Sequence, residues 1–177
     1  MGLLSLSVIA QRSSITEKYI DKFKDIAIRE MIKRKIPASI TLAQGVLESG
    51  SGLSDIAIEL NNHFGIKCAG WTGKKGFYKD DSPKDCFRGY ENADSSFIDH
   101  SFILVTREYY KCLFKLDIKD YKGWANGLKK AGYATNPLYA KKLIKIIEDY
   151  NLYLYDQPEI QLIIDSLNYV FVSNVLQ

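Results

Sequence analysis

One glutamate stands out in the stretch TLAQGVLESGSGLS (41–54), because an apolar helical pattern surrounds it and glycines follow it. Apolar residues cover most of the circumference of a helix here, and only Thr41, Gln44 and Glu48 form a narrow polar stripe along it. A largely buried helix with one polar stripe usually lines a cleft with that stripe. We therefore take Glu48 as the candidate reactive group and Gln44 as a candidate for substrate contact.

The place of Glu48 at the end of this helix affects its affinity for a proton. A helix C-terminus carries partial negative charge and burial disfavours an anion, so both effects raise the pKa of the Glu48 carboxyl. A carboxylic acid that stays protonated near neutral pH is suited to donate a proton to a glycosidic oxygen. From spacing alone a second interpretation stays open, in which Glu48 pairs with a lysine or arginine and is structural.

Local signals predict the elements that position Glu48. Residues 14–17 (Ser-Ile-Thr-Glu) have the form of a capping box, Pro37 suits the first position of a helix, and Gly50 suits a helix C-cap. Short aromatic runs interrupted by glycines between Asn61 and Tyr90 predict loops and a small β-hairpin. The expected helices cover about residues 14–35, 37–49, 54–60, 94–107, 120–130 and 136–150, with a last amphipathic one from Pro158. The fold class is therefore α+β, mainly α, with segregated strands.

Length and composition fit one ordinary globular domain. The chain has 177 residues and a net charge of +3, which is too weak a bias to indicate nucleic-acid binding. No apolar run approaches the roughly 20 residues of a membrane helix. Residues 1–13 are interpreted either as a signal-peptide remnant or as a tail. We expect the domain proper at 14–155 and, over 156–177, a helix that packs on it.

The cysteines and histidines do not indicate a metal site. Cys68, Cys86 and Cys112 lack a Cys-x-x-Cys spacing, and His63 and His100 lack a third ligand at metal spacing, so no metal and no cofactor is expected. Cys68 and Cys86 flank one small segment and can pair in an oxidising compartment. Three free thiols are the alternative, and the sequence leaves both open.

Three ordered motifs resemble a known family. AQGVLESGSGLS…NNHFGIKC, FRGYENADSSFIDHSFIL and YKGWANGLKKAGYATNPLYAKKLIKIIEDYNL are similar to the glucosaminidase family of bacterial cell-wall hydrolases, glycoside hydrolase family 73, over about residues 16–152. The resemblance implies a lysozyme-like helical body with a cleft beside a β-lobe. It also implies hydrolysis of the β-1,4 bond between N-acetylglucosamine and N-acetylmuramic acid, with Glu48 as the general acid. The expected setting is a secreted, periplasmic or cell-envelope protein of a bacterium that acts on peptidoglycan glycan strands. We expect this protein to be a monomer.

The resemblance also places a second carboxylate in the β-lobe, often a glutamate. The matching segment FYKDDSPKDCFRGY offers Asp80, Asp81 and Asp85 instead, and Asp80 and Asp81 lie nearest to the expected position. Asp85 fits a solvated acidic turn better. Tyr133, in AGYATNP, matches a cleft tyrosine of the family. The attacking group stays open between a water held by an aspartate and the substrate's own N-acetyl oxygen.

Further substrate-binding candidates come from the segments that line the cleft in that family. Phe64 is equally explained as core, Asn136 as a helix cap, and Trp124 is expected to pack in the interior. The remaining expectations are Asn62, Trp71, Tyr78 and Tyr139.

Two other functions are compatible with the same residues. The first is a muramidase or lytic transglycosylase on the same general fold, which also uses one catalytic glutamate. The second is a glycan-binding module without catalytic activity.

Overall fold

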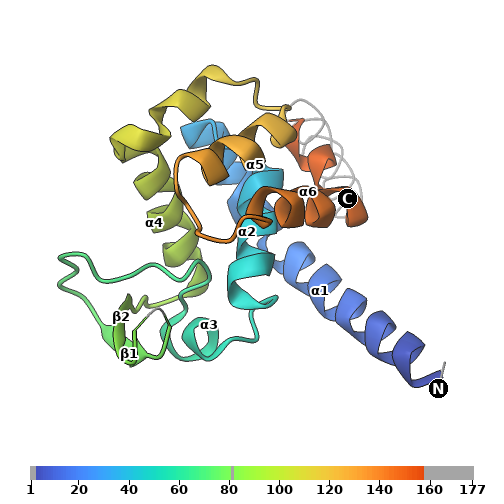
Figure 1. Cartoon of the computed structure of the whole chain (residues 1–177), viewed down its shortest axis with the longest axis horizontal. Coiled ribbons are helices and arrows are strands. Elements are labelled where there is room, and N and C mark those ends of the chain that lie inside the picture. The colour runs from blue at the N-terminus through green and yellow to red at the C-terminus, as the bar shows by residue number, and fades with distance from the viewer. Residues whose placement is uncertain (1–2, 81, 158–177) are drawn as a thin grey trace, which may run out of the picture.

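The helix that carries Glu48, α2 (Ala38–Ser49), lies at the centre of the protein (Figure 1). The computed structural model describes residues 3–80 and 82–157, with side chains from residue 14 onward. Pro37 directly precedes α2, and Gly50 ends it in the left-handed conformation at φ 56°, so the predicted start and C-cap are confirmed. Ten of the twelve residues of α2 are buried, so this helix lies in the hydrophobic core of the domain.

Other helices surround α2 on most sides. α1 (Leu3–Arg34), α6 (Tyr139–Asp149) and the 3-10 helix η2 (Leu152–Asp156) pack directly against it. α4 (Ala93–Thr106) packs on α1, and α5 (Tyr121–Lys130) packs on α6. A second 3-10 helix, η1 (Glu108–Lys115), connects α4 with α5. No helix of the described part is long and apolar enough to cross a membrane.

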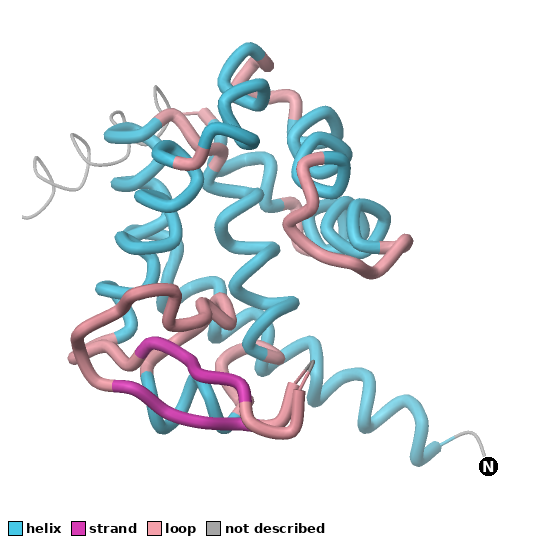
Figure 2. The backbone as a smooth tube through the Cα atoms, turned by 60° about the vertical axis from the view of Figure 1, so that its left-hand side comes forward, coloured by secondary structure: helices cyan, strands magenta, loops and turns pink. Residues whose placement is uncertain are grey.

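The predicted start of the first helix is wrong. α1 begins at Leu3, and its N-terminal part extends away from the body (Figures 1 and 2), so the capping-box residues from Ser14 lie inside the helix. No proline or glycine separates Leu3 from Ser14, and serine and threonine are tolerated in a helix interior, so the capping signal does not stop the helix. The helix expected from Pro158 falls outside the described residues.

The start of α6 also differs from the prediction. Asn136 does not cap the helix, because its Oδ1 accepts from the backbone N–H of Leu138 at 2.8 Å and forms a turn. The N–H of Tyr139 then donates to the Asn136 carbonyl, and α6 begins at Tyr139. This turn sets the direction from which Tyr139 enters the core.

A small lobe follows α2. It contains α3 (Asp55–Leu60), capped by the Ser54 side chain, and an antiparallel hairpin of β1 (Lys75–Tyr78) and β2 (Asp85–Arg88) (Figure 2). A disulfide joins Cys68 to Cys86, with the Cα atoms 5.4 Å apart, which decides between the two alternatives for these cysteines. Cys112 is a free, exposed thiol.

Two polar contacts attach this lobe and the last segment to the helical body. Asp99 on α4 accepts from Arg88 Nη1 at 2.8 Å and from the hydroxyl of Tyr90 at 2.6 Å. At the other end, the buried Asp156 accepts from the backbone N–H and the hydroxyl of Ser39, in the first turn of α2. Burial raises the pKa of Asp156 to about 6. Asp156 therefore holds the start of the helix that carries Glu48, and Asp99 holds the lobe on α4.

Candidate active site

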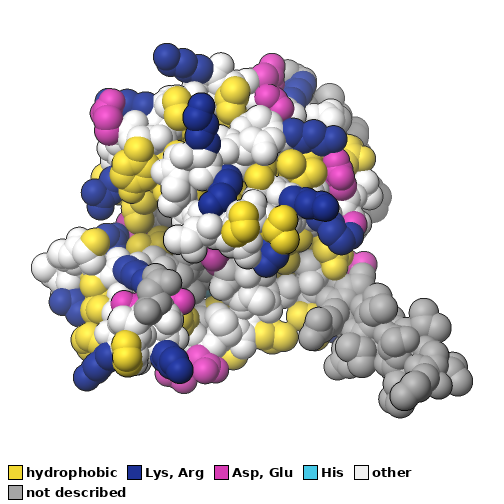
Figure 3. Space-filling view, in the orientation of Figure 1, with side chains coloured by type: hydrophobic (Ala, Val, Ile, Leu, Met, Phe, Trp, Pro, Cys, Tyr) yellow, Lys and Arg dark blue, Asp and Glu magenta, His cyan; other side chains and the backbone are white. Residues whose placement is uncertain are grey.

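A cavity of about 380 Å³ lies between the helical body and the hairpin lobe. Figure 3 shows the surface indented between the lobe at the lower left and the body above it. Five parts of the chain form the cavity: the end of α2, helix α3, the loop before the hairpin, the hairpin, and the loop between α5 and α6. The lining residues that carry chemistry or shape are Glu48, Phe64, Lys67, Asp80, Phe87 and Tyr133.

Glu48 is fixed by a short chain of hydrogen bonds. The hydroxyl of Tyr139 donates to Glu48 Oε1 at 2.9 Å. The same hydroxyl accepts from Gln44 Nε2 at 3.0 Å, and Gln44 is fully buried one helical turn before Glu48. Because Tyr139 has one proton and gives it to Oε1, the other carboxyl oxygen of Glu48 keeps the acid proton available.

The surroundings of Glu48 favour its protonated form. Burial raises the pKa of the Glu48 carboxyl; the bond from Tyr139 and the charge of Lys142 act against this rise, whereas the charge of Asp80 adds to it. No lysine or arginine of the described side chains forms an ion pair with Glu48. Within the described residues, the Glu48 carboxyl is therefore not part of a structural ion pair.

Asp80 lines the same cavity as Glu48. Lys67 Nζ lies 3.3 Å from Asp80 Oδ2 and 3.3 Å from Asp85 Oδ2. Asp85 itself lies on β2, accepts from the Ser82 backbone N–H at 2.9 Å and does not line the cavity. Asp81 falls outside the described residues. The hairpin thus brings one aspartate to the cavity that contains Glu48.

Tyr133 forms a wall of the cavity. Its ring stacks on that of Tyr139, with centroids 5.6 Å apart and planes inclined by 19°, and burial raises the pKa of its hydroxyl well above the usual value. Behind it, His100 contacts Tyr133 edge to face and stacks on Phe64 at 4.0 Å. Burial lowers the pKa of His100 to about 3, so this wall is made of neutral rings.

Three expected substrate contacts have different surroundings from those predicted. Gln44 is separated from the cavity by Tyr139, and Tyr139 is itself buried and contacts Glu48. Asn62 is buried, and its side-chain amide donates to the carbonyls of Ile66 and Arg88. Gln44 was predicted to face the cleft because it lies on the polar stripe of the helix, and Asn62 and Tyr139 because they lie in motifs that resemble the family. Their hydrogen-bonding capacity is used inside the protein, where unsatisfied polar groups are costly.

Three more candidates lie away from the cavity that contains Glu48. The Tyr78 hydroxyl donates to Glu59 on α3 at 2.5 Å, and Asn136 is exposed and bonded to Leu138. Trp71 borders a separate cavity of about 390 Å³. Phe64 lines the cavity together with Tyr133, and it is also part of the core. Trp124 is buried, as expected for packing.

Lys67 was missed as a candidate, although it stands inside the motif NNHFGIKC. Its only sequence signal is a positive charge two residues after Gly65, next to a cysteine. Groups of three or more histidine, cysteine, aspartate or glutamate side chains that could hold a metal ion do not occur among the described residues.

Comparisons with known proteins agree with this geometry. The sequence model of the family described as mannosyl-glycoprotein endo-beta-N-acetylglucosaminidase matches residues 24–152. Exo-glucosaminidase LytG of Bacillus subtilis is 36% identical over 140 residues, which cover 71% of this chain and 48% of the relative. Autolysin of Enterococcus faecalis is 34% identical over 140 residues, covering 68% of this chain and 18% of the relative. The chain thus spans less than half of the length of these curated relatives.

A solved structure extends the match to the fold. The catalytic domain of the autolysin Auto from Listeria monocytogenes superposes with a TM-score of 0.69 at 26% identity. The superposition covers 88% of this chain and 98% of that domain. The predicted mainly helical fold with a small β-lobe is therefore confirmed.

Proposed function

Because the chain belongs to the family of endo-beta-N-acetylglucosaminidases whose model it matches, we propose that it hydrolyses the glycan strands of peptidoglycan. The bond cleaved is the β-1,4 bond between N-acetylglucosamine and N-acetylmuramic acid. The main support is the Glu48 carboxyl, which is half-buried, free of an ion pair within the described residues, and placed at the wall of a cavity. The names of LytG and of the E. faecalis autolysin point to the same class of substrate.

The chemistry begins with a proton on Glu48. Tyr139 holds Oε1, and the other carboxyl oxygen donates the proton to the glycosidic oxygen as the bond to the anomeric carbon breaks. Tyr133 contributes a neutral hydroxyl and an aromatic surface beside the sugar ring. Gln44 acts through Tyr139 and is a positioning residue.

The second group in this proposal is Asp80. Its carboxylate lines the cavity from the hairpin, 3.3 Å from the Lys67 ammonium, and accepts the proton of the attacking water. Direct attack by that water inverts the anomeric configuration. Assistance by the N-acetyl oxygen retains it, so the configuration of the first product, followed by NMR, distinguishes the two routes.

Replacing Asp80 with asparagine is expected to slow hydrolysis by about 10²–10⁴-fold, the usual worth of a general base. Asp85→Asn is the matched control, because Asp85 shares Lys67 but does not line the cavity. Asp81→Asn completes the series. Turnover on purified cell walls is the measurement. Equal, small losses in all three variants would contradict a base at Asp80 and would support assistance by the N-acetyl group.

Replacing Tyr139 with phenylalanine is expected to move the alkaline limb of the pH–rate profile to higher pH. The Tyr139 hydrogen bond lowers the pKa of Glu48, so its loss raises that pKa further, and the acid stays protonated to higher pH. The maximal rate falls by roughly tenfold because the carboxyl loses its anchor. Tyr121→Phe removes a hydroxyl that is bonded to an exposed glutamate and serves as the control. An unmoved alkaline limb would exclude this role of Tyr139.

Product analysis tests the proposed bond. Purified peptidoglycan is digested, reduced and examined by mass spectrometry. Reducing ends on N-acetylglucosamine are expected. Reducing or anhydro ends on muramic acid would instead identify a muramidase or a lytic transglycosylase. Binding without any released product would identify a glycan-binding module.

The proposed place of action is the bacterial envelope or the outside of the cell, where the protein acts as a monomer. The Cys68–Cys86 disulfide supports this location independently of the relatives, because disulfides persist mainly in oxidising compartments. Glycan strands of peptidoglycan are found in the same place.

A further inference from the structure

A second cavity of about 390 Å³ lies on the hairpin lobe and shares no lining residue with the one that contains Glu48. Its walls come from the loop before β1, the segment after β2 and the first turn of α4. The side chains that form it are those of Trp71, Lys74, Tyr90, Glu91 and Ser95. The proposed hydrolysis makes no use of this cavity.

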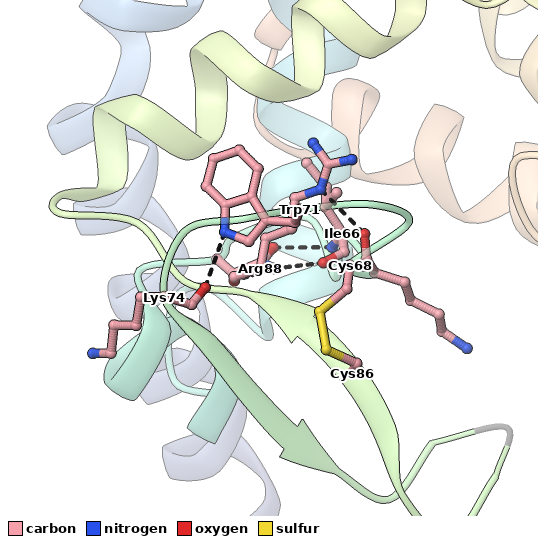
Figure 4. The surroundings of a disulfide bond; sticks show 8 residues. Ile66, Cys68, Trp71, Lys74, Cys86 and Arg88 are labelled. Carbon is pink, nitrogen blue, oxygen red and sulfur yellow. Dashed lines mark hydrogen bonds between the residues drawn. A yellow bond between two sulfur atoms is a disulfide. The ribbon is translucent and has the colours of Figure 1, made fainter.

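Trp71 is held firmly at the edge of this cavity. Its indole N–H donates to the Lys74 carbonyl at 2.9 Å, and the Arg88 guanidinium lies 5.1 Å from the ring centroid (Figure 4). A Cβ atom at Gly73 would lie 2.8 Å from the indole ring, so the ring packs there only because residue 73 is glycine. In Figure 4 the six-membered ring points away from the disulfide and the strands.

Tyr90 provides the second aromatic surface. The rings of Trp71 and Tyr90 are 5.5 Å apart and inclined by 55° to each other. The Tyr90 hydroxyl is already bonded to Asp99, and the Trp71 N–H is already bonded to Lys74. The polar atoms of both side chains are therefore satisfied within the protein. Tyr90 is buried and Trp71 is half-buried, so the Trp71 ring offers the larger carbon surface to a ligand.

The charges around this cavity balance each other. Asp99 neutralises Arg88 at 2.8 Å, and Lys74 and Glu91 contribute one charge of each sign. A strongly charged ligand gains little from such a site. A neutral ligand with apolar faces and many hydroxyl groups fits better, because its C–H faces contact the rings and its hydroxyls bond to Lys74 and Glu91.

We propose that this cavity is a second sugar site, which binds an N-acetylhexosamine unit of a glycan chain away from Glu48. The choice of a glycan as ligand rests on the proposed function. The site itself rests on the cavity, the fixed Trp71 ring at its edge and the balanced charges. A second site on the lobe would hold the protein on a polymeric substrate while the bond is cleaved elsewhere.

The test is a titration of the Glu48→Gln protein with N-acetylchitotetraose, followed by NMR of the indole N–H groups. The chain has two tryptophans, and Trp124 is only 1% exposed, so it is an internal reference. The Trp71 signal is expected to shift with added sugar while the Trp124 signal stays. Trp71→Ala in the same background is expected to weaken this second binding event by about tenfold.

Phe77→Ala is the matched control, because Phe77 is an exposed aromatic residue of β1 that lines neither cavity. If Trp71→Ala lowers the melting temperature strongly, the double variant Lys74→Met with Glu91→Gln is titrated instead, because both residues are exposed. It is expected to weaken the second binding event as well. A Trp71 signal that stays unmoved while residues around Glu48 shift would overturn the proposal. This outcome differs from failure of the proposed function, which would appear as no release of reducing ends from peptidoglycan by the unmodified protein.

Discussion

Glu48→Gln is expected to lower peptidoglycan hydrolysis by several orders of magnitude, since general acid catalysis alone contributes about 10²–10⁴-fold. Glutamine has the same shape and its oxygen still accepts from Tyr139, but it has no proton to give to the glycosidic oxygen. The measurement is the rate of release of reducing ends from purified cell walls. A second readout is clearing in gels that contain cell walls.

Folding is expected to survive this replacement. Because burial raises the folded-state pKa of Glu48, the ionised carboxylate is unfavourable in the folded protein, and this cost grows as pH rises from the unfolded-state value through the folded-state pKa. The glutamine variant avoids that cost, so its free energy of unfolding at neutral pH equals or exceeds that of the parent. Thermal melts at neutral and acidic pH check this.

Glu59→Gln is the control for the first prediction. Glu59 lies on α3, is bonded to Tyr78 and does not line the cavity, so its replacement leaves hydrolysis unchanged. Clearing by the Glu48→Gln protein at the parental rate would refute Glu48 as the general acid. A loss of activity together with a lower melting temperature would show that the change acts on folding.

Removal of the disulfide has the largest expected effect on stability. The bond joins residues separated by 18 positions, for which restriction of the unfolded chain is worth about 3 kcal/mol. The double replacement Cys68→Ser with Cys86→Ser is therefore expected to lower the free energy of unfolding by about that amount. Denaturant titration of the oxidised parent and of the variant measures the difference.

The same replacement is expected to reduce activity even where the protein stays folded. Lys67 and Phe87 line the cavity, and each is next to one of the two cysteines in the chain. Asp80, which also lines the cavity, lies between Cys68 and Cys86 in the sequence. Loosening this loop raises KM and lowers kcat, whereas the Arg88–Asp99 pair still keeps the lobe on α4. Cys112→Ser, which removes the exposed free thiol, is the control. Equal denaturation midpoints for the parent and the double variant would contradict the predicted loss of stability, and equal kcat and KM would contradict the predicted loss of activity.

The sequence alone determined the features that depend on neighbouring residues. Pro37 and Gly50 delimit α2, and the apolar pattern between them places Glu48 at its end. Glycines and aromatic residues after Asn61 predicted the hairpin, and the motif resemblance predicted the fold and the acid. The signals at Ser14 and Asn136 misplaced two helix starts, because capping residues are also compatible with helix interiors and turns.

Only the tertiary structure decided which groups meet. The bond between Tyr139 and Glu48 joins residues 91 positions apart and exists because α6 packs on α2. The fold of the hairpin likewise turns Asp80 towards the cavity and Asp85 away from it, and it pairs Cys68 with Cys86. It also places Trp71 in a cavity of its own. Local patterns do not contain this information, because hydrogen-bond partners and cavity walls depend on the packing of segments distant in the chain.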